Sequence, residues 1–216
     1  MDKTSIENPG FLHYRLEADT LCLGERIRGG LFRPCLKVFT YTALVGALKA
    51  RFPHPFRKIH AIGRFLRDGP NANLLESITF SPRDRSREVS IVPLIIEYLA
   101  NVKVEVFILK NDFTISFPEH FTLHLGAMKS KGFGQCRMSR IGELPRSNPK
   151  PGVLAARIPD SQQVLEAFGV LKVISPVYGY LFQPGTGGTG HYVRSLFEGT
   201  RTVADPVLLK SQEETV

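Results

Sequence analysis

The stretch Gly126-Ala-Met-Lys-Ser-Lys-Gly-Phe-Gly134 decides the fold that we expect for this chain. Its three glycines permit positive φ and close backbone approach, and Lys129, Ser130 and Lys131 lie at the tip of the turn. Successive N–H groups in such a turn form an anion-binding concavity, to which lysines add mobile positive charge. With Phe133, the loop therefore suits a nucleic-acid backbone and one stacked base. A tight β-turn with a solvated basic tip explains the same spacing equally well.

Each part of this glycine-rich loop has an expected role. Lys129 and Lys131 are expected to contact phosphate, and the backbone N–H groups near Gly132 and Gly134 to approach an RNA strand. Phe133 is expected either to stack on a base or to anchor the turn in the core.

The segments around the loop predict an α+β fold. Alternating apolar residues indicate a strand over Phe11–Ala18, and Thr40 suits the N-cap of a helix over Tyr41–Phe52. The elements expected after them are a strand Leu74–Phe80, a polar hairpin tip Ser81–Glu88, a hairpin of Val89–Leu99 and Val102–Lys110 around Ala100-Asn101, a short helix from Pro118 to about Leu125, and a strand Gln135–Ile141. This β-α-β-β-α-β order is that of a ferredoxin-like (RRM-like) domain.

Three prolines between Pro145 and Gly152 mark a boundary. Residues 1–144 are therefore expected to form the ferredoxin-like domain, and residues 145–216 a small C-terminal α/β extension. In the extension we expect a strand over Val153–Ile158, a helix from its cap Asp160 to about Phe168, and an extended run over Val170–Phe182.

Positive charge is concentrated in one part of the chain. The formal net charge is +8, and the window Arg26–Arg67 holds ten Lys/Arg residues without one Asp or Glu. A second acid-free window, His120–Gly142, holds Lys129, Lys131, Arg137 and Arg140. Aromatic residues are interleaved with these cations, which is typical of a polyanion path that also stacks bases. A solvated charged face is the alternative for both windows.

Composition argues against several other classes. No uncharged apolar run approaches the length of a membrane span, and the first residues lack the pattern of a signal peptide. Cys22, Cys35 and Cys136 are isolated, which disfavours a disulfide framework or a zinc site and favours a cytoplasmic setting. His120 and His124 lack a third ligand, so we expect no metal.

Gly185, Gly187 and Gly190 match the spacing of a dinucleotide-binding fingerprint. That fingerprint opens a βαβ unit, and only 26 residues follow Gly190, so we expect no nucleotide cofactor. A loop over Pro184–Gly190 that touches RNA or a neighbouring subunit is the prediction instead.

The segment Lys129-Ser-Lys-Gly-Phe-Gly134 resembles the glycine-rich loop of the CRISPR-associated RAMP superfamily. Gly29-Gly30-Leu-Phe-Arg33 and the helix after it resemble that superfamily's basic first loop and first helix, so the likeness covers about residues 11–142. One departure is that only Gly126 remains of the further glycines that precede the loop in the superfamily.

The resemblance implies a ferredoxin-like protein that binds CRISPR RNA in antiviral defence. Within the superfamily the chain is most similar to the Cas family-five subunit, which holds the 5′ handle of the guide RNA and caps the backbone filament. Its small size suits the version in type IV effector complexes. The implied partners are CRISPR RNA, the backbone and large subunits and, indirectly, the target nucleic acid. The residues expected to contact RNA are Arg26, Arg28, Arg33, Lys37, Tyr41, Lys49, Arg51, Arg57, Lys58, Arg64, Lys129, Ser130, Lys131, Gly132, Phe133 and Gly134.

Two alternatives to a non-catalytic subunit remain open. The first is the metal-independent processing ribonuclease of the same superfamily, Cas family six, in which a general base removes the ribose 2′-OH proton. His54 or His60 would supply that base, assisted by Tyr41 or Lys49, although a histidine in a basic loop also serves to contact phosphate or solvent. The second is a general RNA-binding module outside CRISPR.

Overall fold

The computed structural model describes residues 9–24, 31–54, 58–66, 69–81, 83–84, 89–90, 92–185 and 189–210. In these ranges strands predominate, and they are accompanied by two α-helices, α1 (Tyr41–Arg51) and α2 (Gln162–Ala167). The predicted α+β class is therefore confirmed. No helix of the described ranges combines the length and the apolar character needed to cross a bilayer.

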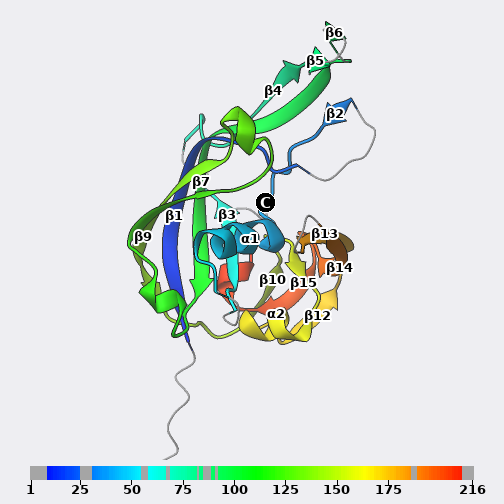
Figure 1. Cartoon of the computed structure of the whole chain (residues 1–216). Helices are drawn as coiled ribbons and strands as arrows, with labels where there is room; N and C mark the ends of the chain where they lie inside the picture. The colour runs from blue at the N-terminus through cyan, green and yellow to red at the C-terminus, as the bar shows by residue number, and fades with distance from the viewer. Residues whose placement is uncertain are drawn as a thin grey trace, which may run out of the picture.

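A seven-stranded sheet forms the centre of the described structure (Figure 1). In it, β1 (Phe11–Leu21) lies between β7 (Leu94–Leu109) and β9 (Gln135–Leu144), and β3 (Ala61–Phe65) pairs with the other side of β7. All these pairings are antiparallel. The order β3–β7–β1–β9, with α1 between β1 and β3 in the chain, is that of a ferredoxin-like unit.

Helix α1 forms where the sequence predicts it. The Thr40 side chain accepts a hydrogen bond from the Ala43 N–H (3.4 Å), and the helix ends just before Phe52 and Pro53. Leu44 and Leu48 are fully buried against the sheet. Each such burial stabilises the fold by about 1.5–3 kcal/mol, so apolar packing holds this helix to the sheet.

Strand β7 corrects the predicted hairpin around Ala100-Asn101. The strand runs unbroken through both residues, with Asn101 at a φ of 52°. Asparagine tolerates this conformation both in turns and in irregular strands. Its presence in the sequence therefore does not distinguish a turn from an irregularity within a strand. At this point the outer partner of β7 changes from β3 to β4 (Leu74–Phe80), and the Asn73 side chain accepts from the Lys103 N–H (2.9 Å) between them.

Strand β8 (His120–His124) replaces the helix expected from Pro118 to Leu125. Phe121 and Leu123 are buried while His120, Thr122 and His124 are exposed, which is the two-residue period of a strand. It pairs with β9 at the sheet edge. The ferredoxin-like order therefore has a strand where its second helix was expected.

The C-terminal part adds two three-stranded sheets and α2. One sheet has the order β10 (Lys150–Val153), β15 (Arg201–Ala204), β12 (Lys172–Ser175), and the other has β11 (Ile158–Pro159), β14 (Gly190–Leu196), β13 (Tyr178–Pro184). The prediction of a single strand over Val153–Ile158 is thus wrong, because between these residues the chain leaves the first of these sheets and enters the second. The N-cap of α2 is Ser161 and not the predicted Asp160, whose carboxylate is paired with Arg194 (2.9 Å).

Two clusters of buried side chains divide the core. Leu12, Tyr14 and Leu16 of β1 join the cluster beneath α1, and Phe11 joins a second cluster. That second cluster also contains Phe168 and other C-terminal residues, so the C-terminal part packs directly on the central sheet.

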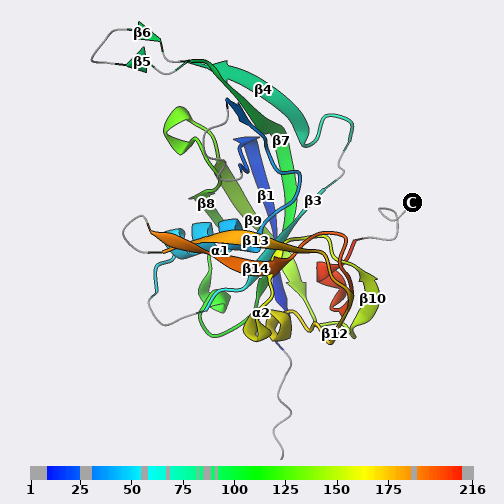
Figure 2. The same cartoon turned by 90° about the vertical axis from the view of Figure 1, so that its right-hand side faces the viewer.

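An arm extends from this body (Figure 2). It consists of β4, the first half of β7, the short β2 (Phe32–Arg33) and a hairpin of β5 (Arg83–Asp84) and β6 (Val89–Ser90). Strands β5 and β6 pair antiparallel, and residues 82 and 85–88 of the predicted hairpin tip Ser81–Glu88 lie outside the described ranges.

Candidate nucleic-acid interface

Gly126 and Gly134 fix the glycine-rich loop to the end of β1. Both have positive φ (83° and 77°), and a Cβ on them would collide with the carbonyl oxygens of Cys22 and Leu125, respectively. The Gly134 N–H donates to the Thr20 carbonyl (2.9 Å). These two glycines therefore permit close backbone packing, and their role is structural.

Two amide groups of the loop are already occupied. The Gly132 N–H donates to the Lys129 carbonyl (3.1 Å), and the Gly134 N–H has the partner just described. An approach of RNA to the backbone near these glycines stays a prediction, but these two N–H groups already have acceptors within the protein. The charged side chains of Lys129 and Lys131 are exposed beside them.

The tip of the loop is a short 3₁₀ turn, η2 (Lys129–Lys131), whose three side chains are exposed. The Lys131 ammonium lies 4.6 Å from the centre of the Phe80 ring. Phe133 is half-buried and meets Tyr98 edge to face at 5.2 Å. Phe80 and Tyr98 belong to β4 and β7, so the loop rests on the arm, and Phe133 has an anchoring contact within the protein.

A groove of about 810 Å³ lies between α1, the base of the glycine-rich loop and the β13–β14 hairpin. We call it the first groove. Small residues of α1, among them Gly46, Ala47 and Ala50, line one part of it. Lys129 and His124 also line it, and among the residues that the structure describes none of those that line it is Asp or Glu.

The aromatic wall of the first groove was not predicted from the sequence. It consists of Tyr180, Phe182, Tyr192 and Phe197, all of which follow the proposed domain boundary. A signal was present, because Tyr178, Tyr180 and Phe182 alternate along one strand. Only the tertiary fold places the hairpin beside α1.

A second groove, of about 480 Å³, lies on another side of α1. It brings together three residues predicted to bind RNA, namely Tyr41, Lys49 and Lys58, with His60. Asp160 and its ion-pair partner Arg194 line it as well.

Buried His60 and partly buried Tyr41 form a pair in the second groove. The Tyr41 hydroxyl lies 2.9 Å from His60 Nδ1, and His60 is only 7% exposed. Burial, followed by the charges of Lys58 and Lys49, lowers the pKa of His60 to about 4. Burial also raises the pKa of Tyr41. Near neutral pH the imidazole is therefore uncharged, and it is a weaker base than an ordinary histidine.

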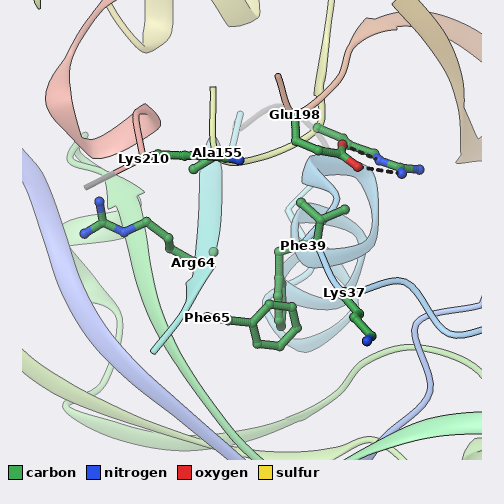
Figure 3. Close-up of a pocket in the computed structure, with 10 residues that line it drawn as sticks. Lys37, Phe39, Arg64, Phe65, Ala155, Glu198 and Lys210 are labelled. Carbon is green, nitrogen blue, oxygen red and sulfur yellow. Dashed lines mark hydrogen bonds and ion pairs between the residues drawn. The ribbon is translucent and has the colours of Figure 1, made fainter. Parts of the chain in front are cut away.

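A third pocket, of about 240 Å³, holds two more predicted cations, Lys37 and Arg64 (Figure 3). Their charged ends point in different directions. The Arg64 guanidinium donates to the Glu105 carboxylate (2.9 Å) and to the Leu209 carbonyl (3.2 Å). Arg157 is likewise held by the Glu198 carboxylate, at 2.7 and 2.9 Å. Carboxylates therefore neutralise much of the charge here.

The cations of the window Arg26–Arg67 that the structure describes are thus divided among several places. Arg33 lies on β2 in the arm, and Arg51 donates to the Thr122 carbonyl (3.1 Å) at the end of α1. His54, the other candidate base, is exposed and contacts the Phe113 ring. Three predicted residues, Arg26, Arg28 and Arg57, lie outside the described ranges.

In the described residues, the glycines of the dinucleotide-binding spacing do not open a βαβ unit, and no metal-binding cluster is found. Gly185 and Gly190 belong to the β13–β14 hairpin and do not precede a helix. Within the described ranges, no group of three or more His, Cys, Asp or Glu residues is placed to hold a metal ion. Cys22, Cys35 and Cys136 are buried free thiols.

No family model matches this chain, and no curated protein matches it by sequence. The fold, however, has counterparts among solved structures. A chain of the "Type III-B Cmr-beta bound to cognate target RNA" superposes with a TM-score of 0.60 at 9% identity, covering 94% of this chain and 91% of that one. A chain of the same assembly bound to cognate target RNA and AMPPnP gives 0.59 at 8% identity, covering 88% and 86%. The likeness establishes a shared fold.

Proposed function

We propose that this protein binds the guide RNA of a CRISPR effector complex as a non-catalytic subunit. The observation that carries the proposal is the first groove, which Lys129 of the loop tip lines and in which none of the described lining residues is a carboxylate. Cations beside aromatic rings without competing acids are the pattern expected for single-stranded RNA.

Two further observations support the proposal. The glycine-rich loop resembles the RAMP loop in its Lys-Ser-Lys-Gly-Phe-Gly segment, and chains with this fold occur in RNA-bound Type III-B Cmr-beta structures. In the finer form of the proposal, the protein resembles a family-five subunit, holds the 5′ handle and caps the backbone filament of a type IV complex. Residues 1–144 then carry the loop, and residues 145–216 supply the opposite wall of the groove.

The test is the salt dependence of RNA binding. Lys129→Ala with Lys131→Ala removes two expected phosphate contacts, so the slope of log affinity against log salt should flatten by about 1.4, near 0.7 per contact for single strands. Fluorescence anisotropy with a CRISPR repeat RNA measures it. Lys150→Ala with Lys172→Ala, two exposed lysines of the C-terminal sheet, is the matched charge control. Equal slopes for both double variants and the parent would refute the proposed RNA site.

A second candidate function rests on the Tyr41–His60 pair. A neutral imidazole with two lysines lining the same groove could act as the general base of a metal-independent ribonuclease. Cleavage of repeat RNA in EDTA that His60→Ala abolishes and His54→Ala leaves intact would establish that activity. With the non-catalytic proposal we expect no cleavage by any of the three proteins.

A further inference from the structure

We infer that the first groove holds unpaired RNA bases stacked on the β13–β14 hairpin, with Tyr180 and Tyr192 as the stacking residues. This inference deepens the proposed function and rests on it. It makes the C-terminal part a direct half of the RNA site, whereas the sequence analysis placed in that part only a loop over Pro184–Gly190 that would touch RNA or a neighbouring subunit.

The shape of the groove suits flat groups. The face of α1 that lines it carries Ala43, Gly46, Ala47 and Ala50, none of which projects far from the helix. A volume of about 810 Å³ falls within the range of sites that enclose small organic ligands. The groove therefore has room for bases between the helix and the hairpin.

The two tyrosines have exposed rings on an ordered support. Tyr180 is 67% and Tyr192 58% exposed, although both line the groove. Tyr192 meets Phe182 edge to face at 5.6 Å. Phe182 in turn lies against Gly190, where a Cβ would collide with its ring. Glycine at this position thus lets the ring lie flat on the opposite strand and fixes the wall that the tyrosines extend.

Charge decides between a base and an apolar peptide as the occupant. Besides the aromatic wall, Lys129 and His124 line the groove, and carboxylates are absent from the part of its lining that the structure describes. A nucleotide satisfies both sides at once, because its base can stack on tyrosine while its phosphate meets Lys129. An apolar peptide would leave the lysine without an anionic partner.

The experiment uses the full chain and repeat RNAs that carry 2-aminopurine at successive positions. Stacking on tyrosine should quench the fluorophore at one or a few positions. Tyr180→Ala with Tyr192→Ala should abolish this quenching and weaken binding on the order of tenfold or more, while the salt slope stays as in the parent. Tyr180→Phe with Tyr192→Phe should retain both, because the ring is kept.

Tyr178→Ala is the matched control. Tyr178 lies on the same hairpin and is 49% exposed, but it stacks with Arg194 and does not line the groove. Its loss should leave both quenching and affinity unchanged. Thermal melting should be the same for all variants, since the replaced rings are about half exposed or more.

Two failures are distinguishable. If the alanine pair binds and quenches as the parent does while the Lys129/Lys131 pair weakens binding, the stacking inference is overturned and the proposed function stands. If the parent binds no repeat RNA, the proposed function is overturned, and the inference with it.

Discussion

The two grooves that flank α1 are built from the same helix yet differ in chemistry. The first combines small helix residues, partly exposed tyrosines and Lys129 of the loop tip, and no acid is among its described lining residues. The second contains buried His60 with its partly buried partner Tyr41, and the Asp160–Arg194 ion pair. An open aromatic surface with cations suits binding, whereas a desolvated histidine with a pKa of about 4 is neutral but a weak base near neutral pH. Helix α1 therefore separates a surface that suits RNA binding from the His60–Tyr41 pair, the residues that a ribonuclease would use.

The largest effect on stability is expected from substitutions in the glycine-rich loop, whose base lines the first groove. Gly134→Val should lower the free energy of unfolding by more than about 3 kcal/mol, because strain at positive φ adds to a collision with the Leu125 carbonyl. Gly132→Val, also at positive φ but with open space around its Cβ, should cost only about 1–3 kcal/mol. Urea denaturation measures both. Equal losses would show that the contacts of Gly134 do not hold the loop.

A smaller effect is expected from His60 in the second groove. Its folded pKa of about 4 lies below the unfolded value of 6.5, so the unfolded state binds more protons between these values. Stability should be fully present above about pH 6.5 and fall as the pH drops, with about 2 kcal/mol lost between about pH 7 and about pH 5. Denaturation at a series of pH values measures this.

His60→Gln should flatten that pH dependence, since glutamine does not titrate. His191→Gln, at an exposed position on β14, is the matched control and should leave the pH dependence as it is. A His60→Gln variant with the parent's pH dependence would mean that His60 titrates normally, and the second groove would lose its distinguishing neutral histidine.

Local sequence patterns were sufficient to predict an element where one hydrophobic period extended over its whole length. The alternation over Phe11–Ala18 predicted β1, and the capped apolar stripe after Thr40 predicted α1. They failed at Asn101 and at residues 118–125. A five-residue strand and a helical turn share much of their pattern, and an asparagine at positive φ fits both a turn and an irregular strand. The partner strands, which are distant in sequence, decide these cases.

The candidate site shows the same limit. The sequence correctly placed the exposed lysines at the loop tip, because glycine spacing is a local property. It could not show that Gly134 serves backbone packing, that Arg64 is held by Glu105, or that Tyr180 and Tyr192 stand beside α1. Each of these depends on contacts between segments far apart in the chain.

The smallest effect concerns Phe133, which joins the glycine-rich loop to the arm. Phe133→Ala should lower the free energy of unfolding by about 1 kcal/mol, less than the 3–5 kcal/mol of a fully buried phenylalanine, because the ring is half exposed. Much of the loss should come from the Tyr98 contact, since aromatic pairs contribute about 0.5–1.5 kcal/mol. A double-mutant cycle with Tyr98→Ala measures that coupling, and Tyr98→Phe, which keeps the ring but loses the hydrogen bond to Glu76 (2.8 Å), should preserve it. The RNA affinity of the Phe133→Ala variant should stay within about twofold of the parent's, because the proposed base-stacking residues lie in the first groove. Unchanged stability with a tenfold weaker affinity would instead assign Phe133 to a base, and the RNA path would then run along the arm rather than between α1 and the hairpin.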